Sequence, residues 1–204
     1  MGFKYYALKI VLICVIVFFL QMFVPGFTEF FLLNKSSWFE PWRFITSIFL
    51  HGGFGHLLYN MFALALFGSL LEKSVGGKRF LIIYLVSGII ANLISINFYD
   101  SSLGASGAIY GVFGVLMVIK PGMMVWAVGF PMPMFIAGLV WATGDLIGLF
   151  TPSNVGHIAH LSGMGVGLIW GVVLRTRHSF RNSENNEFVL DEQEVRKWED
   201  HYLR

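Results

Sequence analysis

Four polar residues stand in apolar stretches of the chain, and their types and spacing allow nucleophilic chemistry. Ser106 opens one apolar segment, His160 lies near the end of another, and His56 and Asn60 are four residues apart in a third. A serine hydroxyl attacks a peptide carbonyl when a base is within hydrogen-bond reach and N–H donors face the developing oxyanion. We therefore expect Ser106 as the nucleophile and His160 as its base. The side chains of His56 and Asn60, with the Ser106 backbone N–H, are expected to form the oxyanion hole.

The apolar segments that carry these residues indicate a membrane protein. Of the 204 residues, 56% are hydrophobic and 13% are charged, which is unlike a soluble domain. Apolar segments suited to a bilayer cover approximately residues 8–25, 55–71, 80–98, 106–119, 131–150 and 158–174. The sequence thus predicts an all-α, polytopic membrane domain of six spans over residues 1–175, followed by a charged tail over residues 176–204. Span four is short, so the loop before it is expected to re-enter the membrane, enclosed by protein.

The distribution of basic residues predicts the orientation of the spans. With the N-terminus in the cytoplasm, nine Lys and Arg residues flank the spans on the inside, and only Lys35 and Arg43 lie outside. Both termini are then cytoplasmic, and the four polar residues share one depth near the exterior face. The lack of a targeting extension favours a prokaryotic cell membrane.

Glycines give spans four and six surfaces that can approach each other closely. Gly107 and Gly111 form a small-xxx-small face, and Gly163 and Gly167 repeat it in span six, while Gly104 precedes the serine. Close packing of these faces would bring His160 toward Ser106. Tyr110, one turn after the serine, points the same way and can support the imidazole ring or simply act as a core or lipid-facing aromatic residue.

Two questions about this site stay open in the sequence. A serine that begins a helix is most often an N-cap, so Ser106 has a purely structural alternative. Asp145 is the only carboxylate in spans three to six and has no assigned partner, so we expect a Ser–His dyad instead of a triad.

Other functional classes fit the residues less well. The basic residues lie in short loops and form no continuous face, which argues against nucleic acid as a partner. The residues His51, His56, His157 and His160 could converge as metal ligands, but no H-E-x-x-H motif or intramembrane carboxylate pair accompanies them. We therefore expect neither metal nor cofactor, and chelator sensitivity would revive the metal alternative.

The motifs around these residues resemble those of the rhomboid family of intramembrane serine proteases, over about residues 38–171. In chain order they are Trp42-Arg43 after Glu40, the H-x4-H-x3-N pattern of His51, His56 and Asn60, the turn residues Glu72, Gly76 and Arg79, the G-x-S-G stretch Gly104-Ala105-Ser106-Gly107 followed by Tyr110-Gly111, and Ala159-His160 with Gly163 and Gly167. Each motif is weak alone, but together, in order and in the right spans, they are specific.

The resemblance implies a function and partners. It assigns Ser106 and His160 to catalysis and His56 and Asn60 to the oxyanion hole, and it implies cleavage of transmembrane protein substrates in the lipid bilayer without a cofactor. Substrate access would involve span five and the following loop, about residues 131–157. An alternative is a catalytically inactive relative that binds membrane clients, although such relatives lose the serine or histidine. Trp42 and Arg43 are expected to anchor the exterior loop. The natural substrate and the oligomeric state leave no signature in the chain.

Overall fold

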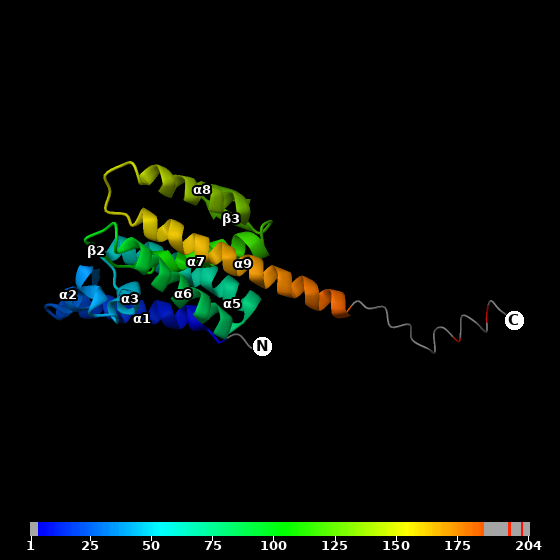
Figure 1. Cartoon of the computed structure of the whole chain (residues 1–204), viewed down its shortest axis with the longest axis horizontal. Coiled ribbons are helices and arrows are strands. Elements are labelled where there is room, and N and C mark those ends of the chain that lie inside the picture. Colours follow the sequence, from blue (N-terminus) through cyan, green and yellow to red (C-terminus); the bar gives the residue numbers. More distant parts are fainter. Residues whose placement is uncertain (1–3, 186–195, 197–200, 202–204) are drawn as a thin grey trace. The chain divides into compact units, whose positions relative to one another are not determined.

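In the part of the chain that the structure describes, six helical stretches lie where the apolar segments predict spans. The computed structural model describes residues 4–185, 196 and 201. The stretches are α1 (Tyr6–Phe23), the continuous run Phe54–Val75, α6 (Gly77–Ser95), α7 (Ser106–Ile119), α8 (Met134–Gly148) and α9 (His157–Asn185) (Figure 1). Four of them are long and apolar enough to cross a membrane, namely α1, the 54–75 run, α6 and the part of α9 up to Thr176. The other two, α7 and α8, have 14 and 15 residues and are shorter than a usual span.

The second helical stretch is interrupted by a π-helical turn. It consists of α4 (Phe54–Ala63), the π-helix η3 (Leu64–Gly68) and α5 (Ser69–Val75). A Cβ atom on Gly68 would lie 3.1 Å from the Ala7 Cβ, so the absence of a side chain there lets α1 approach closely. Single π-turns inside α-helices are often found beside functional sites.

The segment between α1 and α4 is a chain of short elements. It comprises α2 (Phe27–Phe31), β1 (Leu33–Asn34), η1 (Lys35–Trp38), α3 (Arg43–Thr46) and η2 (Ser47–Phe49). The β1 strand pairs antiparallel with β2 (Ser101–Ser102), with Leu33 opposite Ser102 and Asn34 opposite Ser101. This small sheet ties the segment to the residues that immediately precede Ser106.

Arg43 and Trp42 organise that segment and lie outside the candidate site. Arg43 is buried, and its Nη1 donates hydrogen bonds to the backbone carbonyls of Glu29 at 2.6 Å and Leu32 at 2.9 Å. Its Nε lies 2.7 Å from a carboxylate oxygen of Glu40, so the charge is paired as well as hydrogen-bonded. Trp42 stacks on Phe30 with ring centroids 6.0 Å apart. Both side chains therefore have the contacts of loop anchors.

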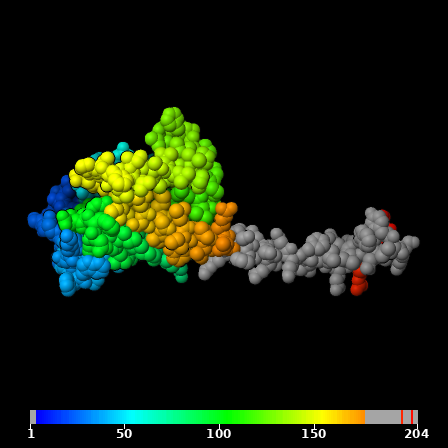
Figure 2. All heavy atoms as spheres, turned by 45° about the horizontal axis from the view of Figure 1, so that its top comes forward, coloured from blue at the N-terminus to red at the C-terminus, as the bar shows by residue number. Residues whose placement is uncertain are grey.

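A second small sheet joins α7 to α8. Its strands β3 (Met124–Ala127) and β4 (Phe130–Pro133) form a hairpin whose two turn residues, Val128 and Gly129, both have positive φ, as a type I′ hairpin turn requires. In the space-filling view the yellow-green region that includes this hairpin protrudes from the surface (Figure 2). The chain is therefore mostly helical but not purely so. The expectation that span five begins at residue 131 is wrong by three residues, because 131–133 belong to β4.

The last helix, α9, extends beyond residue 175 into the predicted tail. The predicted membrane domain ends at residue 175, whereas α9 continues without a break to Asn185. The remainder of the predicted charged tail, apart from residues 196 and 201, lies outside the described residues.

Candidate active site

Ser106 is the first residue of α7 and is not its N-cap. The capping position is Ala105, and no side-chain cap bond closes this end of the helix. The structural alternative for Ser106, an N-cap, is therefore wrong. The backbone N–H groups of the first turn of a helix have no intrahelical partner and carry a partial positive charge. The serine hydroxyl thus lies beside groups that favour a developing oxyanion.

Gly104 brings the chain before the serine against the His56 ring. Its φ is 131°, a value that L side chains rarely adopt, and its N–H donates to the Ser47 carbonyl at 2.9 Å. A Cβ atom at position 104 would lie 3.0 Å from His56 Nε2 and 3.9 Å from Ser106 Oγ. His56 Nε2 and Ser106 Oγ therefore both lie close to the position that a side chain at residue 104 would occupy.

The protonation of His56 follows from its backbone contact. The N–H of Gly52 donates to His56 Nδ1 at 3.3 Å, so in the neutral ring the proton sits on Nε2. That N–H faces the Gly104 side of the ring, toward Ser106, as an oxyanion donor must. Asn60 is buried one turn later, and its Nδ2 donates to the His56 carbonyl at 2.9 Å, which leaves a second amide N–H.

Glycine contacts hold α7 and α9 at backbone distance. A Cβ atom on Gly163 would overlap the carbonyl of Gly107, and one on Gly167 would overlap the carbonyl of Gly111. These overlaps are with backbone atoms, which cannot move aside as a side chain can. The two small-residue faces predicted from the sequence therefore meet, and the turn of α9 that carries His160 packs beside the start of α7.

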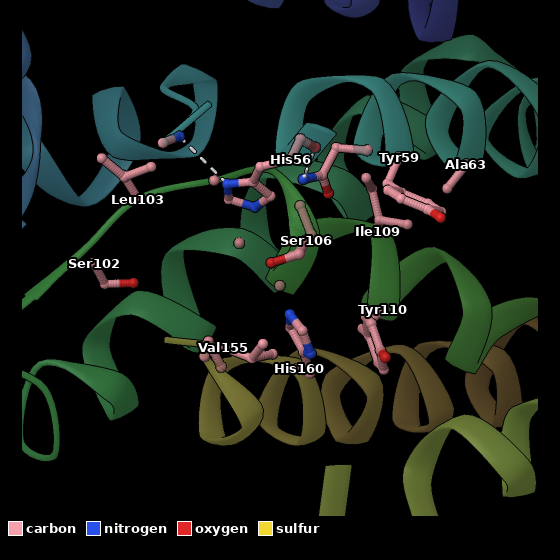
Figure 3. A pocket seen from close by; sticks show the side chains of 18 of the residues that line it. His56, Tyr59, Ala63, Ser102, Leu103, Ser106, Ile109, Tyr110, Val155 and His160 are labelled. Atoms are coloured by element: carbon pink, nitrogen blue, oxygen red, sulfur yellow. Dashed lines mark hydrogen bonds between the residues drawn. The ribbon is translucent and has the colours of Figure 1, made fainter. Parts of the chain in front are cut away.

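His160 lies across the cavity from Ser106. One nitrogen of its ring is directed toward the serine, which is on the opposite wall (Figure 3). The ring stacks on Tyr110, with centroids 4.3 Å apart and planes inclined by 11°. This stacking restrains the orientation of the His160 ring.

The four polar residues predicted for the site line one cavity of about 1120 Å³. Besides Ser106, His160, His56 and Asn60, the lining includes aromatic side chains, namely Tyr59 and Phe62 of α4, Trp141 of α8 and Trp126 of the hairpin. Gly104 and Gly107 border it as well. Gly163, Gly167, Trp42 and Arg43 are not part of its lining.

Asp145 is the site residue that the sequence reasoning missed. Its Oδ1 lies 2.9 Å from His160 Nδ1 and 2.6 Å from His157 Nδ1, and only 5% of the carboxylate side chain is exposed. Asp145, His157 and His160 are called the carboxylate–imidazole cluster below. They offer three ligand atoms within 4.8 Å of one another, which could also hold a metal ion. Ionisable residues within membrane spans usually pair with one another, and this rule could have pointed from Asp145 to a histidine partner.

His51 has a structural environment. The Gln21 side chain of α1 brackets its backbone, accepting from its N–H at 2.9 Å and donating to its carbonyl at 3.2 Å. The ring is buried edge-on against His56, with centroids 5.2 Å apart. Burial, and secondarily the neighbouring His56, lower the pKa of His51 to about 4, so the ring is neutral near pH 7.

Comparison with known proteins identifies the family. The Rhomboid domain family matches residues 38–177. The chain is similar to the rhomboid-family protein YdcA of Bacillus subtilis (38% identity over 64% of this chain and 65% of that one) and to rhomboid-like protein 11 of Arabidopsis thaliana (32%, over 67% and 53%). It is also similar to the rhomboid protease GlpG of Haemophilus influenzae (30%, over 66% and 70%). The chain thus spans less than two thirds of the length of the first two. Its match to the domain over more than half of its length shows that this chain is a member of the rhomboid family of multi-pass membrane proteins.

Proposed function

We propose that this protein is an intramembrane serine endopeptidase that hydrolyses peptide bonds in or near transmembrane segments of other membrane proteins. The observation that carries the proposal is the single cavity in which Ser106, His160, His56 and Asn60 converge. Relatives named rhomboid proteases support it. The complete set of predicted catalytic residues also argues against the inactive, client-binding alternative.

The chemistry follows from the positions of the side chains. Ser106 Oγ attacks the scissile carbonyl while its proton passes to the ring nitrogen of His160 that faces it. The negative charge on the former carbonyl oxygen is stabilised by the first-turn N–H of α7, His56 Nε2–H and the remaining Asn60 amide N–H. His160 then protonates the leaving amine, and a water molecule repeats the sequence on the acyl-enzyme.

The aromatic lining of the cavity suits a transmembrane substrate. Tyr59 and Phe62 on α4 and Trp141 on α8 offer apolar surface in the same cavity as Ser106 and His160, as a membrane-spanning peptide requires. A transmembrane helix satisfies its own backbone hydrogen bonds, so the scissile bond must leave the helix before it reaches Ser106. Substrates with helix-breaking residues near the cleavage point should therefore be cleaved faster.

The proposal includes the membrane arrangement. We assign α1, the 54–75 run, α6, α7, α8 and the first part of α9 to six spans, with both termini cytoplasmic and the site opening near the exterior face. The short α7 and the loop before it would form the re-entrant element. We propose a prokaryotic cell membrane as its location, as the sequence suggests.

The test is cleavage of a generic single-span substrate in proteoliposomes, together with labelling by a fluorophosphonate probe. We expect wild type to cleave and to be labelled, and Ser106→Ala and His160→Ala to do neither. Ser74→Ala is the matched control, because Ser74 is exposed and its Oγ donates only to the Leu70 carbonyl in α5. Wild-type protein that is neither active nor labelled, but retains a transmembrane client on purification, would instead support the inactive alternative.

A further inference from the structure

The carboxylate–imidazole cluster places a buried carboxylate against two histidine rings. Asp145 lies in the last turn of α8, a helix that is otherwise apolar over most of its length. Removing a carboxylate from water is costly unless hydrogen bonds compensate it. Here two imidazoles approach the same oxygen, Oδ1, from adjacent turns of α9. The contact distances are those of charge-assisted hydrogen bonds.

The arrangement fixes which nitrogen of each ring carries the proton. An ionised carboxylate only accepts, so the Nδ1 atoms of His157 and His160 that face Asp145 must both be protonated. The remaining nitrogen of each neutral ring, Nε2, is then an acceptor. In His157 this nitrogen is 2.9 Å from the Ser153 hydroxyl, which can donate to it. In His160 it is the nitrogen directed toward Ser106 (Figure 3).

From these contacts we propose, building on the endopeptidase function above, that Asp145 is a positioning residue for the catalytic base. It holds His160 in the Nδ1–H tautomer, so that Nε2 is free to accept the Ser106 proton, and its charge stabilises the imidazolium formed when that proton arrives. The proton moves from Oγ to Nε2 and then to the leaving amine, while the Nδ1 proton stays on His160. The site is thereby a Ser–His–Asp arrangement, not the dyad expected from the sequence.

His157 also contacts the Asp145 carboxylate and weakens the effect of its charge on His160. Both rings donate to the same oxygen, so a donor from His157 withdraws part of the negative charge from His160. The surface of α8 leaves room for this second ring, because a Cβ atom on Gly148, three residues after Asp145, would overlap the His157 imidazole. Of the other titratable groups, Tyr110 stacks on His160 and His56 lies on the opposite wall of the cavity.

The first experiment compares Asp145→Asn with wild type in proteoliposomes over a range of pH. The amide keeps the shape of the side chain but removes its charge, so kcat should fall by at least about 10²-fold while KM changes little. The acidic limb of the kcat/KM profile should move to lower pH, because the imidazolium loses its counter-charge. Glu29→Gln makes the corresponding carboxylate-to-amide change at an exposed position of α2, outside the cavity lining, and should match wild type.

Replacing His157 tests the sharing of the carboxylate. His157→Gln leaves Asp145 and His160 in place and removes one donor from Oδ1. We expect kcat within about tenfold of wild type, with the acidic limb displaced to higher pH, opposite to the displacement in Asp145→Asn. A merely structural role for the cluster would lower the thermal midpoint of both variants and leave the pH profile where it is.

A second measurement does not depend on activity or on a variant that must fold. In ¹⁵N-histidine NMR of the full chain in bicelles, with the His160 signal identified from His160→Gln, the proton should lie on Nδ1. An Nε2–H tautomer would overturn the proposal, and so would an Asp145→Asn enzyme with wild-type kcat and pH profile. An inactive wild type with His160 in the Nδ1–H form would refute the endopeptidase function alone.

Discussion

The backbone contact between α7 and α9 can be tested by adding a single methyl group. In Gly163→Ala the new Cβ would overlap the carbonyl oxygen of Gly107, whose position is fixed by the helix. To approach an ordinary van der Waals separation the two helices must move apart by more than about 1 Å. His160 lies one turn earlier on the same helix, so the separation carries the base away from Ser106.

Two magnitudes follow from that displacement. Overpacking of this kind costs about 1–3 kcal/mol of stability. A misplacement of about 1 Å in the catalytic geometry costs roughly 10²-fold in rate. We therefore expect Gly163→Ala to fold with a lowered thermal midpoint in detergent and to cleave a transmembrane substrate about a hundredfold more slowly. KM should change less than kcat, since the cavity walls formed by α4 and α8 are untouched.

The matched control lies two residues further along. A Cβ atom on Gly165 would meet no atom within 4 Å, so Gly165→Ala changes helix propensity by the same amount without touching α7. Both variants are assayed for proteoliposome cleavage, fluorophosphonate labelling and thermal unfolding. Equal activity and stability in Gly163→Ala and Gly165→Ala would refute the argument that the glycine contact sets the distance between nucleophile and base.

Three further predictions concern other parts of the molecule. Glu72 is buried and accepts the backbone N–H groups of Lys4 at 3.1 Å and Ala7 at 3.0 Å, so Glu72→Gln should lower the unfolding free energy by about 1–3 kcal/mol, measured by thermal denaturation in micelles. The pKa of His51 is lowered to about 4 in the folded chain by burial and by His56, whereas the unfolded chain binds a proton there below about pH 6.5. Stability from this site is complete above pH 6.5 and falls by about 2 kcal/mol by pH 5, so the thermal midpoint of His51→Phe should decline less than that of wild type between pH 7.5 and 5. Finally, Asp145 Oδ1 is already hydrogen-bonded to the Nδ1 atoms of His157 and His160. Cleavage should therefore be unchanged by prolonged treatment with a chelator. A loss of activity that added zinc restores would show that the cluster binds a functional metal.

Much of this architecture could be predicted because the membrane restricts the alternatives. Apolar segments long enough for a bilayer leave few choices but helices, and all six segments contain one. The approach of α7 to α9 was predictable for a related reason. Glycines spaced four apart on both segments offer backbone surface to each other, and packing, not hydrophobicity, drives helix association in lipid.

The contacts that were not predicted depend on turns. Asp145 and His160 are fifteen residues apart, and the loop between them decides which face of α9 meets the end of α8. Nothing in the residue types of that loop specifies its path. The β3–β4 hairpin was missed because its strands are four residues long and contain two prolines, so they show no alternating pattern. The role of Ser106 as first helical residue and not N-cap likewise depends on the path of the chain through Gly104.

The antiparallel pairing of β1 with β2 has a consequence for attempts to exchange parts between relatives. Leu33 and Asn34 pair the segment between α1 and α4 with Ser101 and Ser102, and the Gly104 N–H donates to the Ser47 carbonyl, so the stretch leading to Ser106 is supported by residues far upstream. A chimera that receives the 26–50 segment from a homologue will lose that support unless residues 99–105 are grafted with it. In recombination experiments these two pieces should behave as one inherited block, although about fifty residues separate them in the chain.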